Sequence, residues 1–107
     1  MKLQDKPFQS IKNRIKTIEM RLYDEKRKLI ETGDEIVFTN LKSGVNLKAK
    51  VKNIFLFRNF QELYNAFDKT KLGYQENEDA SPNDMEIYYP KEEQQSYGVC
   101  GIEIEVI

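Results

Sequence analysis

The stretch KTIEMRLYDEKRK, residues 16–28, combines a short apolar alternation with charged residues of both signs. Ile18, Met20 and Leu22 alternate with polar or charged neighbours, which is the period of a half-buried β-strand. A basic run, Lys26 to Lys28, follows after only a few residues. The pattern predicts a strand followed by a basic turn. It leaves open whether the charged face of this strand is a solvated edge or the wall of a binding site.

On the N-terminal side of this strand, the sequence predicts a helix. Phe8, Ile11 and Ile15 recur at helical spacing, and Pro7 suits the first helical position. On the other side, Asp24 is placed to cap one or two helical turns. The strand is therefore expected between two helical segments.

The rest of the chain predicts three further strands. Residues 34–39 and 45–57 are separated by the turn LKSG and are close enough for a hairpin. A last alternating strand covers residues 100–106, with Cys100 on its apolar face. The strand at 45–57 has an apolar face, and its opposite face carries a polar stripe that includes Lys48, Lys50 and Lys52.

Two more helices are expected in the C-terminal half. Asn59 with Glu62 three residues later resembles a capping box, which predicts an amphipathic helix over residues 60–67. After a polar loop at 69–80, Ser81 followed by proline predicts another helix start. The order of elements indicates an α+β fold, and short half-apolar strands suit a small mixed β-barrel flanked by short helices.

Length and composition are those of one globular domain, residues 1–107. The chain is 39% hydrophobic and 33% charged, and its single cysteine allows no internal disulfide. A reducing, cytoplasmic location fits this cysteine usage. No apolar run approaches the roughly 20 residues of a membrane span. The opening MKLQDKPF has no apolar signal region, so we expect neither secretion nor membrane association.

The small net charge of −1 hides an asymmetry between the two halves. Residues 1–58 hold 14 Lys and Arg against 7 Asp and Glu, a balance of +7. Residues 59–107 hold 3 against 11, a balance of −8. A basic patch favours partners that carry phosphate. The alternative is that the halves interleave in space and no such patch forms.

The residue inventory excludes several classes of chemistry. The chain has no histidine, so it has no Ser-His-Asp or Cys-His nucleophile. We expect no zinc or other metal site, and no cofactor, because there is also no phosphate-cradling glycine motif. Cys100 is expected in the core. Any catalysis would depend on Lys, Glu, Asp, Thr or Tyr.

Lys16, Glu19 and Arg21 are the first candidate site residues. Glu19 and Arg21 fall on one face of the predicted strand, where same-face neighbours lie about 7 Å apart. A carboxylate and a guanidinium so placed can read the donor and acceptor edges of a base or an amide. A buried lysine can also serve as a base or a nucleophile. The alternative is an intrastrand ion pair on a wet surface.

The basic turn is the second candidate. Lys26, Arg27 and Lys28 would track phosphates if they lay close to the lysine face of residues 45–57. That lysine face can equally be a solvated strand face that blunts an edge. Tyr23, Tyr74 and Tyr97 are expected near loops, where a tyrosine ring can stack on a base. Tyrosines on helical apolar faces are expected in the core, which holds for Tyr64, Tyr88 and Tyr89.

Three segments together resemble a known family. They are FQSIKNRIKTIEMRLYDEKRKLIETGDEIVFTN, FQELYNAFDKTKLGY and SPNDMEIYYPKEEQQSYGVCGIEIEVI. The chain resembles the ASCH domain of the PUA-like superfamily, close to the small stand-alone versions of Gram-positive bacteria. The family motif Gly-x-Lys-x-x-Glu-x-Arg is matched by Lys16, Glu19 and Arg21. Arg14 stands at the motif glycine, so we expect the left-handed cap of the preceding helix to move to Asn13.

The resemblance implies a PUA-like β-barrel flanked by helices, with a cleft lined by the motif. The superfamily is associated with RNA and with modified bases. In related bacterial amidohydrolases that remove acetyl from N4-acetylcytidine, a Lys, a Thr and a Glu form the proposed catalytic set. The Lys corresponds to Lys16, the Thr position is Glu19 here, and the distal Glu corresponds to Glu76. The hydroxyl nucleophile of that set is therefore missing.

Three functional hypotheses follow. The first is an RNA- or nucleotide-binding module in which Lys16, Glu19 and Arg21 form the cleft and the basic turn holds phosphate. The second is an enzyme, either an amidohydrolase acting on an N4-acetylcytidine-like nucleoside or a ribonuclease, with Lys16, Glu19 and Glu76 as its working groups. The third is a protein-interaction or regulatory domain that uses the acidic half. The sequence does not decide whether the protein is an enzyme, nor its oligomeric state.

Overall fold

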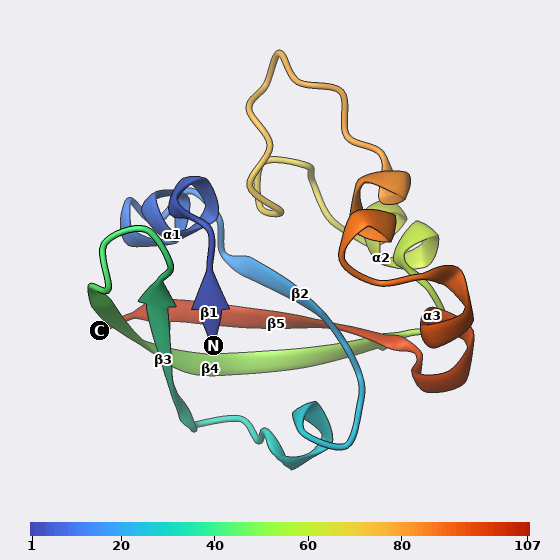
Figure 1. The fold of residues 1–107 in the computed structure, drawn as a ribbon, viewed down its shortest axis with the longest axis horizontal. Helices are drawn as coiled ribbons and strands as arrows, with labels where there is room; N and C mark the ends of the chain where they lie inside the picture. The colour runs from blue at the N-terminus through green and yellow to red at the C-terminus, as the bar shows by residue number, and fades with distance from the viewer.

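A computed structural model describes all residues, 1–107. Five strands and several short helices follow one another along the chain (Figure 1). The elements are β1 (Lys2–Leu3), α1 (Asp5–Lys12), β2 (Ile18–Leu22), the 3-10 helix η1 (Arg27–Leu29), β3 (Glu35–Asn40), β4 (Asn46–Phe57), α2 (Phe60–Ala66), the 3-10 helix η2 (Pro82–Ile87), α3 (Lys91–Tyr97) and β5 (Val99–Val106).

The five strands form one mixed sheet in the order β1-β3-β4-β5-β2. β1 runs parallel to β3, and every other neighbouring pair is antiparallel. The long strands β4 and β5 form the centre, with a register shift between Val51 and Asn53. The sheet curls into a half-barrel whose end strands, β1 and β2, share no ladder. This arrangement confirms the expected α+β class and PUA-like architecture. It also confirms the expected hairpin, which β3 and β4 form.

The apolar side chains form two clusters on the two faces of the sheet. The first joins α1 to β3, β4 and β5 and contains Leu3, Phe8, Ile11, Ile36, Phe38, Ala49, Val51, Cys100, Ile102 and Ile104. The second joins β2 to α2 and η2 and contains Ile18, Met20, Leu22, Phe60, Leu63, Leu72, Met85 and Val99. Both faces of β2 are therefore covered, although its sequence alternates like a half-exposed strand.

The local signals for helix ends are partly confirmed. The side chain of Asn59 accepts the Glu62 N–H at 3.0 Å, so Asn59 caps α2 as expected. Asp24 accepts the N–H of Arg27 at 3.1 Å and supports the short turn of η1. Ser81 caps η2, which is a 3-10 helix. The capping box is incomplete because the Glu62 carboxylate accepts the N–H of Arg58, not that of Asn59.

The first helix differs from the sequence expectation at both ends. It begins at Asp5, so Pro7 lies inside the first turn and not at the first position. It ends at Lys12, and Ile15 lies beyond it with an exposed side chain. Asn13 keeps a negative φ of −83°, whereas Arg14 adopts φ 63°. The expectation that Asn13 takes over the left-handed position was wrong, because the turn geometry is set at the motif glycine position whichever residue occupies it.

Two further features were not predicted. β1 is a strand of two residues with no visible period, and it forms only because it pairs with the exposed edge of β3. Tyr88 was expected in the core, but its side chain is 60% exposed. Tyr88 follows the last residue of η2, whereas Met85 within η2 is buried.

Candidate functional site

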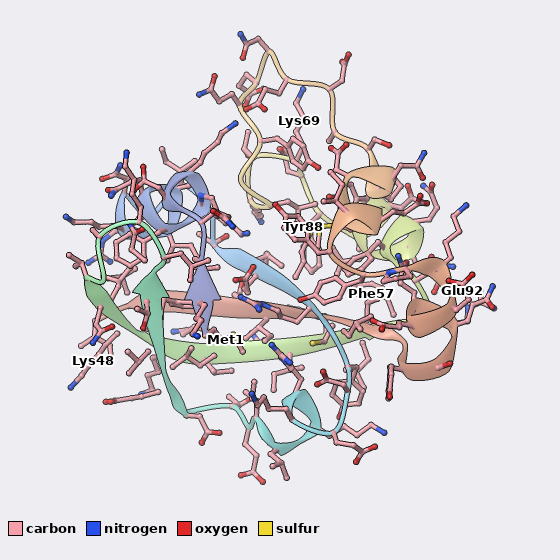
Figure 2. The ribbon with its side chains drawn as sticks, viewed as in Figure 1. Met1, Lys48, Phe57, Lys69, Tyr88 and Glu92 are labelled. Carbon is pink, nitrogen blue, oxygen red and sulfur yellow. The ribbon has the colours of Figure 1, made fainter.

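A cleft of about 470 Å³ opens between the two halves of the molecule. Its floor is β2, one wall is β1 with the start of α1, and the opposite wall is the 72–74 turn with η2. Figure 1 shows α1 and the loop that follows α2 rising on either side of β2. Figure 2 shows Tyr88 in the region between β2 and η2. The cleft therefore joins segments from both ends of the sequence.

Three charged groups of the motif converge at the floor of this cleft. The Glu19 carboxylate lies 3.1 Å from the Lys16 ammonium through Oε1 and 3.2 Å from Arg21 Nη2 through Oε2. Glu19 Oε1 also accepts the Met20 N–H at 2.9 Å. Arg21 Nη2 donates to the carbonyl of Lys2 at 3.1 Å, and so bridges the open seam between β2 and β1. We call Lys16, Glu19 and Arg21 the triad. It is part of the barrel's closure as well as part of the cleft.

The strand register explains why these charges are buried. Glu19 stands opposite Ile102, and Arg21 stands opposite Cys100, on β5. Directly opposite residues of paired strands share a face of the sheet. Glu19 and Arg21 therefore lie on the face that carries the first apolar cluster, and the side chain of Glu19 is only 4% exposed. The wet-edge alternative for this stretch does not hold.

The electrostatics of the triad keep Glu19 and Arg21 charged. Burial alone would raise the pKa of Glu19, but the adjacent Lys16 and Arg21 outweigh it and hold that pKa below its usual range. Burial opposes the charge of Arg21 as well, yet Glu19 and Tyr89 raise its pKa. At neutral pH the site thus presents one carboxylate, already matched by two cations. Glu19 can accept a proton there, but it holds none to donate.

Lys16 is positioned by a turn on the far side of the cleft. Gly73 has φ 102°, and a Cβ built on it would lie 3.0 Å from the Lys16 side chain at Cδ. Only a residue without a side chain fits this close approach and this backbone conformation. The Lys71 carbonyl also accepts the N–H groups of Thr17 and Ile18, each at 3.0 Å. The 71–73 turn therefore packs against Lys16 and the start of β2, and the Lys16 side chain is 8% exposed.

A hydrogen-bonded row of three side chains forms part of the opposite wall. The Tyr64 and Tyr74 hydroxyls are 2.8 Å apart, and the Tyr74 hydroxyl donates to Asp84 Oδ2 at 2.7 Å. Burial and these hydrogen bonds raise the pKa of Tyr74, and burial raises that of Tyr64. Both phenols are neutral at physiological pH. We call Tyr64, Tyr74 and Asp84 the tyrosine wall.

The structure separates the sequence-predicted residues into two groups. Lys16, Glu19 and Arg21 all line the cleft. The other candidates are not among its lining residues; they are Tyr23, Lys26, Arg27, Lys28 and Glu76. Figure 1 shows the turn of η1 below the sheet, on the other side from the loop that follows α2.

The basic turn is largely engaged in local contacts. The Arg27 guanidinium pairs with Asp24 at 3.0 Å, and Lys28 lies 3.6 Å from Glu25 and 5.9 Å from the ring centre of Tyr23. In the loop that follows α2, the backbone carbonyl of Glu76 accepts a hydrogen bond from the Lys69 ammonium. The glutamate of this loop that lines the cleft is Glu78, not Glu76.

Sequence reasoning missed most of the far wall. Tyr64, Tyr88 and Tyr89 line the cleft although they were assigned to the core. Tyr89 stacks on Phe60, with ring centres 5.9 Å apart, so its core role is partly correct. The available signal was the Tyr-Tyr pair just before Pro90, at the end of a short helix. An aromatic residue at that position has space to turn towards solvent.

The placement of the acidic side chains, the single thiol and the helices bears on other kinds of site. No group of three or more His, Cys, Asp or Glu side chains is placed to hold a metal ion. Cys100 is buried as expected, and burial raises its pKa to about 12, so its thiol is not a nucleophile at neutral pH. The longest helix, α1, has 8 residues, and none of the helices could traverse a membrane.

The comparisons with known proteins agree with this architecture. The family model described as ASCH domain matches residues 1–107. The chain belongs to the ASCH domain family. None of the curated proteins matches it significantly. The ASCH assignment thus covers the same residues as the cleft and both of its walls.

Two solved structures are similar to this ASCH domain over its whole length. One is the crystal structure of the hypothetical protein PH0355, with 36% identity, a TM-score of 0.83, and coverage of 100% of this chain and 96% of that chain. The other is the solution structure of protein PF0455 from Pyrococcus furiosus, with 36% identity, a TM-score of 0.70, and coverage of 100% and 94%. An archaeal neighbour gives no support to the expected bacterial type.

Proposed function

We propose that this ASCH domain binds RNA, or a modified nucleoside within it, by taking one nucleoside into the cleft. The observation that carries the proposal is the convergence of the Lys16–Glu19–Arg21 triad with tyrosines from a distant segment around one cavity. A cytoplasmic location, which the single buried thiol favours, belongs to the same proposal.

The size and lining of the cleft suit a nucleoside. Its volume of about 470 Å³ lies within the roughly 300–1,000 Å³ of small-molecule sites. Of the 20 lining residues, 10 are hydrophobic, so the lining is mixed and offers both apolar surface and several charged groups. Tyr88 offers an exposed aromatic face for stacking, which contributes about 1–3 kcal/mol per base in single-strand binding.

The charges at the cleft favour a phosphate-bearing ligand. Lys2 and Lys6 line the α1 wall near the mouth, and Lys16 and Arg21 lie at the floor. Lys6 pairs with Glu78 at 3.3 Å across the cleft, an exposed contact that a phosphate can replace at low cost. A guanidinium such as that of Arg21 carries five N–H donors, a number that suits carbonyl and phosphate oxygens.

Binding is tested with a fluorescent mixed-sequence RNA and titration at several salt concentrations. We expect log Kd to rise linearly with log salt, since phosphate contacts release counterions. Tyr88→Ala should weaken binding about tenfold, in line with the loss of one stacked base. Tyr97→Ala is the matched control, because Tyr97 is also exposed but does not line the cleft. Equal affinity of the two variants, or binding indifferent to salt, would overturn the proposal.

A second candidate function is hydrolysis at the same cleft, which the Lys16–Glu19 contact of 3.1 Å favours. Lys16 would serve as base or nucleophile, and Glu19 would accept a proton. The bond broken would be the amide of an N4-acetylcytidine-like nucleoside or an RNA phosphodiester. The wild type and Lys16→Met are incubated with N4-acetylcytidine and with mixed RNA, and products are followed by mass spectrometry. Product from the wild type alone supports an enzyme. Retention of RNA without product leaves the binding function.

The interaction hypothesis remains a third outcome of these experiments. Partners captured by the wild-type protein are compared before and after nuclease treatment. Loss of the partners with nuclease supports the RNA-binding proposal, because the bridging molecule is then RNA. Partners that survive nuclease and the Tyr88→Ala substitution would favour a protein-interaction surface outside the cleft.

A further inference from the structure

We propose that two apolar side chains at the mouth of the cleft separate the base that enters it from its neighbours in the RNA. The ligand is then an RNA with an unpaired nucleotide, and neither a free nucleoside nor a continuous duplex. We call Leu41 and Ile87 the apolar lip. The inference rests on the proposed function, because it names the form in which the cleft receives its nucleoside. It is carried by the exposure of both lip residues at the edge of a cavity whose floor is buried.

The two lip residues come from opposite walls of the cleft. Leu41 directly follows β3, and its N–H donates to the Leu3 carbonyl at 2.9 Å, which places it beside β1. Ile87 is the last residue of η2, on the side of the tyrosine wall. Figure 1 shows the loop between β3 and β4 near α1, and η2, in orange, on the other side of β2. Both residues line the cleft, yet Leu41 is 53% exposed and Ile87 is 84% exposed. They therefore lie at its mouth and not in its interior.

The interior of the cleft has apolar surface of its own. Its buried apolar lining residues are Leu3, Met20, Leu72 and Met85. A nucleoside at the floor can contact these side chains and the triad without covering the lip. Single exposed apolar side chains are common on protein surfaces, but exposed apolar groups gathered round one cavity indicate a binding site. The lip therefore indicates a ligand that extends beyond the cavity.

The depth of the triad decides which form of RNA can reach it. Lys16 and Glu19 are buried at the floor, so only a group that enters the cleft meets them. In a duplex each base is held in the stack, and a pocket of this kind receives a base only after the base has left it. Leaving the stack costs least for a nucleotide that is bulged or already single-stranded. The cleft therefore favours RNA with an unpaired nucleotide.

The lip suits the gap that such a nucleotide leaves behind. Proteins that unstack bases insert Leu, Ile and similar apolar side chains between base steps. Contact of Leu41 and Ile87 with the neighbouring bases removes apolar surface from water on both partners. Lys2 and Lys6 line the same wall as Leu41, and their charges favour a phosphate-bearing chain over an apolar peptide as the occupant of the mouth.

The test compares the affinities of the full chain for three fluorescent RNAs of one sequence. They are a perfect duplex, the same duplex with one bulged nucleotide, and the single strand. We expect the perfect duplex to bind at least about tenfold more weakly than the other two, because it must first unstack a paired base. A 2-aminopurine placed beside the bulge should become brighter when the protein binds, since its fluorescence rises as stacking is lost.

Substitution of the lip should reduce both signals. Ile87→Ala and Leu41→Ala should each weaken binding of the bulged RNA about tenfold, the effect of roughly one to two fewer buried methylene groups. Both variants should also diminish the rise in 2-aminopurine fluorescence. Because both side chains are exposed, the fold is expected to tolerate these substitutions.

Two controls make the same kind of change away from the cleft. Leu29 is 79% exposed and Leu56 is 57% exposed, and neither lines the cleft. Leu29→Ala is therefore matched to Ile87→Ala, and Leu56→Ala to Leu41→Ala; both controls should behave as the wild type.

The outcomes separate this inference from the proposed function. Equal affinity of the wild type for the duplex and the bulged RNA would overturn the inference alone. So would lip variants that match their controls while Tyr88→Ala still weakens binding, or a nucleoside monophosphate that competes as strongly as the bulged RNA. Binding of none of the three RNAs would overturn the proposed function itself.

Discussion

Glu19→Gln tests the central feature of the site, the single buried carboxylate between two cations. Glutamine has nearly the same shape, so the substitution removes charge without opening a cavity. It leaves Lys16 and Arg21 in the cleft floor without their shared counter-charge, which lies 3.1 Å and 3.2 Å away in the wild type. Removal of one partner from a buried ion pair typically costs about 3–5 kcal/mol.

That loss is large for a domain of this size, whose free energy of unfolding is expected to be roughly 5–15 kcal/mol. With a urea m-value of about 2 kcal/mol/M, a loss of about 4 kcal/mol lowers the midpoint by about 2 M. Unfolding is followed by far-UV circular dichroism, since the chain has no tryptophan. The Lys52–Glu105 pair supplies the control, because it is exposed and Glu105→Gln should cost less than about 1 kcal/mol.

The pH dependence of stability gives a second readout of the same group. The folded-state pKa of Glu19 is lowered from 4.5, because Lys16 and Arg21 outweigh the effect of burial. A lowered folded pKa contributes stability that is present above the unfolded value and is lost as pH falls through the folded value. The wild type should therefore lose this contribution below about pH 4.5, and Glu19→Gln should lack it. Equal losses for Glu19→Gln and Glu105→Gln at neutral pH would refute the account of a buried, structurally required carboxylate.

Two substitutions at the turns beside the triad test its positioning. Arg14→Gly should raise the free energy of unfolding in urea by about 1 kcal/mol. The backbone at Arg14 has φ 63°, which strains a residue with a side chain by about 1–2 kcal/mol. Glycine removes this strain, but part of the gain is lost because glycine also increases the entropy of the unfolded chain. Arg14→Ala keeps the strain and should show no such gain; an equal gain would contradict this explanation. Gly73→Ala places a Cβ 3.0 Å from Lys16 Cδ at φ 102°, so we expect a loss of about 1–3 kcal/mol and weaker RNA binding. Unchanged stability and affinity would show that Lys16 does not depend on this turn.

Local patterns in the sequence were sufficient for most of the fold. The alternation in β2 and β5, the cap at Asn59 and the turn between β3 and β4 each depend on residues a few positions apart. Such signals survive without knowledge of the rest of the chain. The same holds for the triad, because the spacing of Glu19 and Arg21 places them on one face of a strand. The short strand β1 has no such signal, and it depends on an edge contributed by β3.

The character of the cleft depended on contacts between distant segments. The sequence by itself determined an α+β domain of ASCH type in which Lys16, Glu19 and Arg21 stand together. Only the tertiary structure decided that Glu19 is buried, because that depends on which face of β2 the first apolar cluster covers. It also decided that Tyr64 of α2 and three later tyrosines line the cleft, whereas the basic turn of η1 does not. The physical reason is that burial and juxtaposition result from packing of the whole chain, whereas periodicity and capping result from neighbours along it.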